Sequence, residues 1–153
     1  MDLILWRHAE AVPERPELPD LERPLTAKGE RQAQRMAEWL NRRLPESTRI
    51  LVSPALRCQQ TAQALGRKFR TVEEVRPDVS PAQVLAAARW PDGVEPVLVV
   101  GHQPTLGMVC ASVLTGSAAP WTLKKGALWW FRQRDREGEG QVLVQAVQAP
   151  DGL

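Results

Sequence analysis

The chain has 153 residues, which is the size of one ordinary domain built around a single hydrophobic core. Apolar residues make up 43% and charged residues 25%, a composition that does not support a disordered or fibrous protein. The net charge of +2 comes from basic and acidic residues interleaved along the chain, without the basic stripe of a nucleic-acid-binding protein. We therefore expect residues 1–153 to form one domain that has no nucleic-acid partner.

The first residues and the apolar runs bear on location. The chain opens without a basic leader, and no apolar run approaches the roughly 18 residues that a membrane-spanning helix requires. Cys58 and Cys110 are far apart in sequence, so we expect two buried, reduced thiols and neither a disulfide nor a zinc site. These features predict a cytoplasmic protein with no membrane partner.

Short, unbroken apolar runs predict the strands of a central sheet. Residues 3–6, 50–52 and 97–100 have the composition of strands buried on both faces of a mainly parallel sheet. Two further apolar-rich runs, 127–133 and 141–148, flank a polar segment that contains glycine. This arrangement predicts a β-hairpin at the end of the chain.

Helical patterns lie between the predicted strands, and the expected ranges are 26–44, 53–68, 81–89 and 104–115. Ser53 is expected as the N-cap of the second helix, with Pro54 as its first helical residue. Gly116 provides a stop for the last helix. The alternation predicts an α/β fold with three layers, α/β/α, in which helices flank a mostly parallel sheet. The acidic, proline-rich segment 10–24 is expected to be a surface loop.

The residues that follow the predicted strands share one chemical character. Arg7 and His8 follow the first strand, Arg57 lies in the first turn of the helix after the second, and His102 follows the third. In an open α/β sheet, ligands bind beyond the carboxyl ends of the strands, where helix N-termini favour anions. Both histidines of the chain therefore fall where arginines or helix dipoles can bind an anion.

Four motifs at these positions resemble those of the histidine phosphatase superfamily. Residues 7–9 (RHA) resemble its R-H-G signature, and residues 23–29 resemble its R-P-L-T-x-x-G element. Residues 53–61 resemble S-P-x-x-R-x-x-Q-T, and residues 101–104 (GHQP) resemble the second histidine motif. The resemblance implies a phosphoglycerate mutase-like fold of branch 1, and the short chain looks most like the SixA subgroup, the phosphohistidine phosphatases. Ala9 stands where the family usually has glycine, close to the expected phosphate position.

The resemblance implies a covalent, two-step reaction. His8 would attack phosphorus through one ring nitrogen while an acceptor holds the other, and water would then hydrolyse phospho-His8. Arg7 and Arg57 would bind phosphate oxygens through their planar forks of donors, and their charge would lower the pKa of His8. His102 would hydrogen-bond the phosphate and stabilise the transition state. Arg23 is either a further phosphate contact or part of a salt bridge within the loop.

The general acid is the least defined part of the predicted site. Asp78 occupies about the position where many family members carry an acidic proton donor, and Asp20 is the second candidate. An alkoxide leaving group needs such a proton, whereas imidazole, whose conjugate acid has a pKa of about 6.5, leaves far more readily. Both histidines already have roles and no carboxylates cluster at ligand spacing, so we expect no metal ion or other cofactor.

Three functions fit these observations. The first is a SixA-like phosphatase acting on phosphohistidine of a signalling protein, and the second is a phosphatase of small phosphomonoesters. The third is an inactive module that binds a phosphorylated ligand. The segment between the Arg57 helix and the strand before His102 is short, which predicts an open site that admits a side chain of a folded protein. The sequence predicts no oligomeric state.

Overall fold

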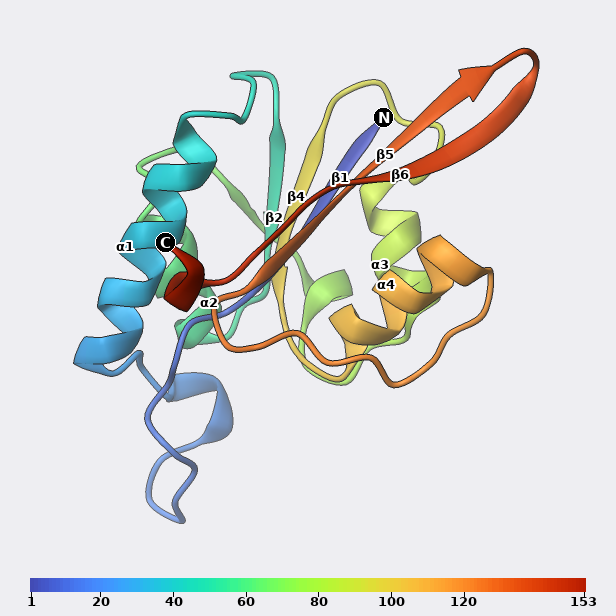
Figure 1. The fold of residues 1–153 in the computed structure, drawn as a ribbon. Helices are drawn as coiled ribbons and strands as arrows, with labels where there is room; N and C mark the ends of the chain where they lie inside the picture. Colours follow the sequence, from blue (N-terminus) through green and yellow to red (C-terminus); the bar gives the residue numbers. More distant parts are fainter.

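A computed structural model describes residues 1–153 and contains one six-stranded mixed sheet. Its strands are β1 (Asp2–Arg7), β2 (Arg49–Val52), β3 (Arg70–Thr71), β4 (Val97–Gly101), β5 (Leu128–Arg136) and β6 (Glu139–Gln148). The order across the sheet is β3-β2-β4-β1-β5-β6 (Figure 1). The first four of these run parallel, while β5 pairs antiparallel with β1 and forms the C-terminal hairpin with β6. The predicted fold class is confirmed.

Helices cover both faces of the sheet. The four α-helices are α1 (Ala27–Asn41), α2 (Leu56–Gln63), α3 (Pro81–Ala88) and α4 (Thr105–Thr115). The chain also forms three short 3-10 helices, η1 (Asp20–Glu22), η2 (Glu73–Val75) and η3 (Pro150–Gly152). In Figure 1, α1 and α2 lie on one side of the sheet and α3 and α4 on the other, which gives the three layers. None of these helices combines the length and the apolar character needed to cross a bilayer.

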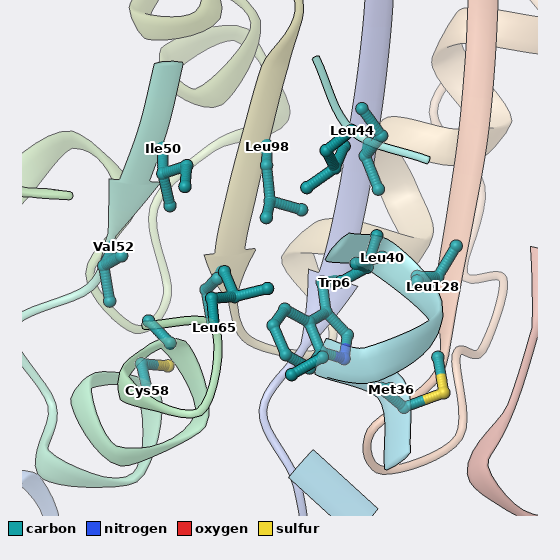
Figure 2. Close-up of a cluster of buried hydrophobic side chains, with 14 of the residues drawn as sticks. Trp6, Met36, Leu40, Leu44, Ile50, Val52, Cys58, Leu65, Leu98 and Leu128 are labelled. Atoms are coloured by element: carbon teal, nitrogen blue, oxygen red, sulfur yellow. The ribbon is translucent and has the colours of Figure 1, made fainter. Parts of the chain in front are cut away.

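Strand β1 is buried on both faces, and its side chains alternate between two hydrophobic cores. Ile4 and Trp6 belong to the core beneath α1 and α2, where Trp6 packs near Met36 and Leu40 (Figure 2). Leu3 and Leu5 point to the opposite core, beneath α3 and α4. A register shift of one residue would exchange these two sets, so the double burial fixes β1 in the sheet and with it the residues that follow its last position.

The C-terminal hairpin is longer than its apolar runs predicted. β5 and β6 extend beyond the rest of the sheet (Figure 1), and Glu137 and Gly138 make the turn with φ of 54° and 82°. Two consecutive positive φ angles are the signature of a two-residue turn whose twist matches that of the strands. Backbone pairing through this tight turn continues the strands into polar residues that hydrophobic patterning does not mark.

The structure corrects the prediction for the second helix. Ser53 is not the N-cap: α2 begins at Leu56, and Ala55 is in the N-cap position without any side-chain hydrogen bond. The Ser53 hydroxyl instead lies 2.7 Å from the His102 ring. The helix also ends at Gln63, before the predicted end at 68, because the chain turns at Gly66, whose φ is 67°.

Two smaller differences concern an unpredicted short strand and the end of the first helix. Strand β3 was not predicted, because both of its residues are exposed and polar and so carry no hydrophobic pattern. Helix α1 ends at Asn41 and not at 44; Leu44 is still buried in the core, but it lies beyond the turn that follows the helix. Apolar spacing therefore located α1 better than it located the end of this helix, and it did not detect β3.

The R-P-L-T-x-x-G motif joins the loop after β1 to the start of α1. The Thr26 hydroxyl caps the helix by accepting a hydrogen bond from the Gly29 amide at 3.0 Å. The Thr26 amide donates to the Glu10 carbonyl, also at 3.0 Å. A Cβ atom at Gly29 would overlap that same carbonyl, so only glycine lets the helix approach the loop this closely.

We predict that Gly29→Ala destabilises the protein by about 2 kcal/mol, because the added methyl group forces the Glu10 backbone away from α1. Denaturant unfolding followed by circular dichroism measures the effect. Gly101→Ala is the matched control, since its Cβ would meet only the Leu106 side chain at an ordinary 3.5 Å. Alanine is the better helix former, so a Gly29→Ala variant more stable than the wild type would show that no such clash exists.

Candidate active site

The ends of β1, β2 and β4 lead into one cleft of about 380 Å³. All the site residues predicted from the sequence line this cleft: Arg7, His8, Asp20, Arg23, Arg57, Asp78 and His102. They come from five separate segments of the chain. Parallel pairing explains the convergence, because β1 and β4 lie side by side with Arg7 opposite Gly101. The residues that follow these two positions, His8 and His102, have ring centroids 5.4 Å apart.

His8 is held in one orientation by its own backbone surroundings. Its amide donates to the Gly101 carbonyl at 3.1 Å, and its carbonyl accepts from the Gly126 amide at 3.0 Å. The ring nitrogen Nδ1 lies 2.8 Å from the Ala9 carbonyl oxygen. A carbonyl only accepts hydrogen bonds, so Nδ1 carries the proton and Nε2 keeps its lone pair.

Ala9, the departure from the usual R-H-G motif, fits the structure without obstructing the cleft. Its methyl group is fully buried against Leu25 and Ala33, in a small apolar cluster of its own. Its amide donates to the Thr61 hydroxyl at 3.1 Å. The extra carbon atom is therefore accommodated by hydrophobic packing away from the cleft.

Both histidines are strongly biased toward the neutral form. Burial is the largest cause for His8 and lowers its pKa to about 4, and the charges of Arg57 and Arg7 act in the same direction. Burial followed by the charge of Arg57 lowers the pKa of His102 to about 3. The predicted effect of the arginines on His8 is confirmed in direction, although burial contributes more. At neutral pH both rings are uncharged.

Two guanidinium groups border the histidines. Arg57 is 4% exposed, and its Nη1 donates to the Asp20 carbonyl at 2.8 Å. Arg7 donates through Nη1 to the Leu123 carbonyl at 2.7 Å. The Nε atoms of Arg7 and Arg57 are buried without any hydrogen-bond partner in the protein. Each cation therefore keeps one unused donor, and both side chains line the cleft that contains the neutral histidines.

Asp20 links two arginines of the cleft. One carboxylate oxygen lies 3.2 Å from Arg57 Nη2 and the other 3.0 Å from Arg23 Nε. Partial burial acts to raise the pKa of Asp20, but the Arg57 charge and the hydrogen bonds from Arg23 and Arg57 outweigh it and lower that pKa. Asp20 is thus a stable carboxylate and is poorly suited to donate a proton. Arg23 forms the predicted loop salt bridge while also lining the cleft.

Asp78 lies at the outer edge of the cleft beside Pro77. It is exposed and has a φ of 65°, a left-handed conformation that aspartate tolerates better than most residues. It belongs to the loop that leads into α3, whereas Asp20 lies in the segment between β1 and α1. Asp78 is therefore an exposed cleft carboxylate that no arginine holds, and Glu14 is another.

The loop between α4 and β5 is a part of the cleft that no sequence motif predicted. This loop adds Lys125 to the cleft and supplies the Leu123 carbonyl that holds Arg7. Gln103 fixes the loop by donating to the Trp121 carbonyl at 3.0 Å while accepting from the Gly107 amide at 2.8 Å. Nothing in the local sequence around Lys125 marks it, because its place depends on contacts with α4.

The cationic charge of the cleft comes from side chains of arginine and lysine. No group of three or more His, Cys, Asp or Glu side chains in the structure is arranged to hold a metal ion. A reaction without a metal or other cofactor stays a prediction.

Comparison with known proteins identifies a family whose chemistry agrees with the arrangement of residues in the cleft. The model of the histidine phosphatase superfamily (branch 1) matches residues 3–80. The chain belongs to this superfamily. It is 32% identical over 128 residues to the phosphohistidine phosphatase SixA of Escherichia coli K12, with 78% of each chain covered. It is accordingly an enzyme of the phosphatase class.

Solved structures of SixA proteins share the whole fold. The structure of the protein histidine phosphatase SixA complexed with tungstate superposes with a TM-score of 0.80 and 29% identity over 99% of both chains. A putative SixA from Agrobacterium tumefaciens gives a TM-score of 0.80 and 26% identity over 97% of both chains. The likeness therefore includes the C-terminal hairpin as well as the motif-bearing first half.

We predict that both histidines titrate far below pH 6.5, with midpoints at about 4 for His8 and about 3 for His102. The cause is burial beside Arg57, so stability linked to these rings is complete above pH 6.5 and is lost as the pH falls toward 4. Proton NMR of the ring signals during an acid titration measures the midpoints, and the urea-unfolded protein is the control. A midpoint near 6.5 in the folded state would contradict the buried, neutral site.

Proposed function

We propose that the enzyme transfers a phosphoryl group from phosphohistidine on a signalling protein to Nε2 of His8 and then hydrolyses phospho-His8. The single observation that carries this proposal is the His8 ring. Its Nδ1 is bonded to the Ala9 carbonyl, so the unprotonated nitrogen is Nε2, in a cleft lined by Arg7 and Arg57. A neutral imidazole with a fixed free lone pair is a nucleophile.

The first step forms the bond between His8 Nε2 and phosphorus and breaks the bond between phosphorus and the leaving nitrogen. The leaving imidazole takes a proton from solvent, and the charge that develops on His8 is balanced through its Nδ1–H hydrogen bond to Ala9. In the second step, water attacks phospho-His8 and releases inorganic phosphate, which returns the ring to its neutral form. The low pKa of His8, about 4, keeps the nucleophile available at neutral pH.

Arg7 and Arg57 are the proposed phosphate ligands. The phosphoryl group in transfer carries negative charge on three oxygens, and catalysis consists mainly of positioning them and stabilising that charge. Both guanidinium groups line the cleft, and their planar forks of donors match the oxygens of an oxyanion. A tungstate complex of a SixA protein supports this role, because tungstate is also a tetrahedral oxyanion. His102 is the third proposed phosphate ligand. Arg23, which is paired with Asp20, completes the proposed pocket.

The surroundings of Asp20 and Asp78 favour a leaving group that departs without a proton from a buried acid. Asp20 is held as an anion by Arg57 and Arg23, so we do not assign it as the acid. Asp78 is the remaining proposed proton donor, at the exposed rim. Imidazole, with a conjugate-acid pKa of about 6.5, leaves readily without a buried acid, whereas an alkoxide does not.

The open rim supports a protein substrate. Between α2 and β4 the chain forms only the short β3, η2 and α3, and just Pro77 and Asp78 of this segment reach the cleft. A cleft bordered so lightly can receive a side chain that projects from a folded protein. The name of the Escherichia coli relative, a phosphohistidine phosphatase, selects phosphohistidine as that side chain.

Two further parts of the proposal concern the chain as a whole. We propose that residues 1–153 form one domain, supported by the single sheet that both hydrophobic cores share.

We also place the reaction in the cytoplasm. Cys58, which is fully buried with its sulfur 3.5 Å from the His102 ring, favours a compartment in which thiols remain reduced.

We predict that incubation with phosphoramidate, a small donor with a phosphorus–nitrogen bond, produces an acid-labile adduct of one phosphoryl group on His8. Intact-mass analysis after a rapid alkaline quench detects it. His8→Ala should show neither adduct nor turnover, while Arg136→Ala, on the exposed hairpin, should match the wild type. Turnover that survives in His8→Ala would remove the covalent mechanism, and the absence of both adduct and turnover in the wild type would favour an inactive binding module.

We predict a higher kcat/KM for a phosphohistidine protein than for sugar phosphates, because the open cleft lacks a buried acid for alkoxide leaving groups. Asp78→Asn separates the two reactions. It should lower kcat/KM on sugar phosphates by on the order of 100-fold and leave that on phosphohistidine nearly unchanged. A strong preference for sugar phosphates would overturn the protein substrate, and equal losses on both substrates would overturn the role of Asp78.

A further inference from the structure

Ser53 has a contact that the proposed reaction does not use. Its side chain is fully buried, and its hydroxyl oxygen lies 2.7 Å from Nε2 of His102. The same oxygen accepts a hydrogen bond from the Ala55 amide at 3.2 Å. Ser53 is thus in contact with the ring edge that is turned away from the cleft.

The opposite edge of the His102 ring faces Arg57. Nδ1 lies 3.3 Å from Nη2 of the guanidinium group. A guanidinium group has only donors, so Nδ1 must accept and therefore carries no proton. A neutral imidazole has one N–H group, which leaves the proton on Nε2, where it is donated to the Ser53 hydroxyl.

The neighbouring thiol does not change this assignment. The Cys58 sulfur is 3.5 Å from Nε2, but burial raises the pKa of the Cys58 thiol to about 12, so the sulfur keeps its proton. That proton is directed to the Gly101 carbonyl at 3.7 Å. Sulfur is a weak acceptor, and the hydroxyl at 2.7 Å is the stronger partner for the ring N–H.

We propose that Ser53 is a positioning residue that holds His102 in the Nε2–H tautomer, with the Nδ1 lone pair turned toward Arg57 and the cleft. His8 has the opposite tautomer, with its proton on Nδ1. The two histidines thus differ in which nitrogen is protonated, although both are neutral and their rings are adjacent. In each case a buried partner on one ring edge decides the state of the other edge.

This tautomer has a consequence for phosphate binding, which rests on the proposed function. The lone pair on Nδ1 of His102 repels a fully ionised phosphate oxygen. A hydrogen bond between Nδ1 and that oxygen therefore needs a proton between the two atoms. A monoprotonated phosphoryl group supplies this proton, because its P–O–H group can donate to Nδ1. No bond to phosphorus changes in this step. Arg57, released from Nδ1, can then direct its Nη2 donors to the phosphate.

Nitrogen-15 NMR of the histidine rings tests the tautomer directly, without substrate and without any assumption about turnover. The chain has only two histidines, so just four ring nitrogens contribute. We expect His102 to show a protonated Nε2 and an unprotonated Nδ1 at pH 7, and His8 to show the reverse. A protonated Nδ1 on His102 would overturn the proposal even if the enzyme is a phosphatase.

Ser53→Ala tests whether Ser53 causes the tautomer. We expect the His102 signals to shift toward a mixture of both tautomers while those of His8 stay unchanged, and kcat/KM to fall by about tenfold, which corresponds to the loss of one hydrogen bond. Ser53→Thr keeps the hydroxyl and should restore the wild-type tautomer. The control is Thr115→Val at the far end of α4, where the hydroxyl bonds only to the backbone of Ala111 and Ser117.

Two results would show that Ser53 does not have this role. One is an unchanged His102 tautomer in Ser53→Ala. The other, should the alanine variant not fold, is an unchanged tautomer in Ser53→Cys, whose side chain fills a similar volume but accepts hydrogen bonds only weakly. If the tautomers are as expected and phosphohistidine is not hydrolysed, the assignment of Ser53 stands and the proposed function fails.

Discussion

The parallel pairing of β1 with β4 is the interaction on which the rest of the site depends. It places Arg7 opposite Gly101, so that the next residue along each strand is a histidine and both histidines emerge at the same edge of the sheet. The amide of His8 bonds to the carbonyl of Gly101, which continues the ladder one step beyond the strands. Double-sided burial of β1 fixes this register, because a slip of one residue would exchange the side chains that pack in the two cores.

Burial at this edge is costly for charges, and the site resolves that cost in two ways. The histidines become neutral, with pKa values of about 4 and about 3. Arg57 stays charged, and the Asp20 carboxylate and backbone carbonyl compensate its charge. The same arginine adds to the effect of burial that keeps His102 neutral, pairs with Asp20 as its counter-ion and borders His8. A substitution at Arg57 would therefore alter ring protonation as well as anion binding.

Much of the fold could be predicted from patterns of residues that lie close together in the sequence. The three apolar runs are β1, β2 and β4, and the four helical patterns correspond to α1 to α4. Apart from the ends of α1 and α2, the errors occur where a side chain has a distant partner or where pairing is made by backbone alone. Ser53 has the composition of an N-cap, but its hydroxyl bonds to His102, forty-nine positions away. β3 joins the sheet through its backbone, and its exposed polar side chains leave no pattern.

The order of residues established which residue types stand at the ends of the strands, and the four motifs together pointed to the family. It could not decide protonation, because the state of each ring depends on partners from other segments: Ala9 for His8, and Ser53 with Arg57 for His102. Its ranking of Asp78 above Asp20 rested only on the family resemblance, since both are aspartates in polar loops. Only the tertiary structure pairs Asp20 with two arginines and leaves Asp78 at the rim, and this difference in surroundings gives two identical side chains different chemistry.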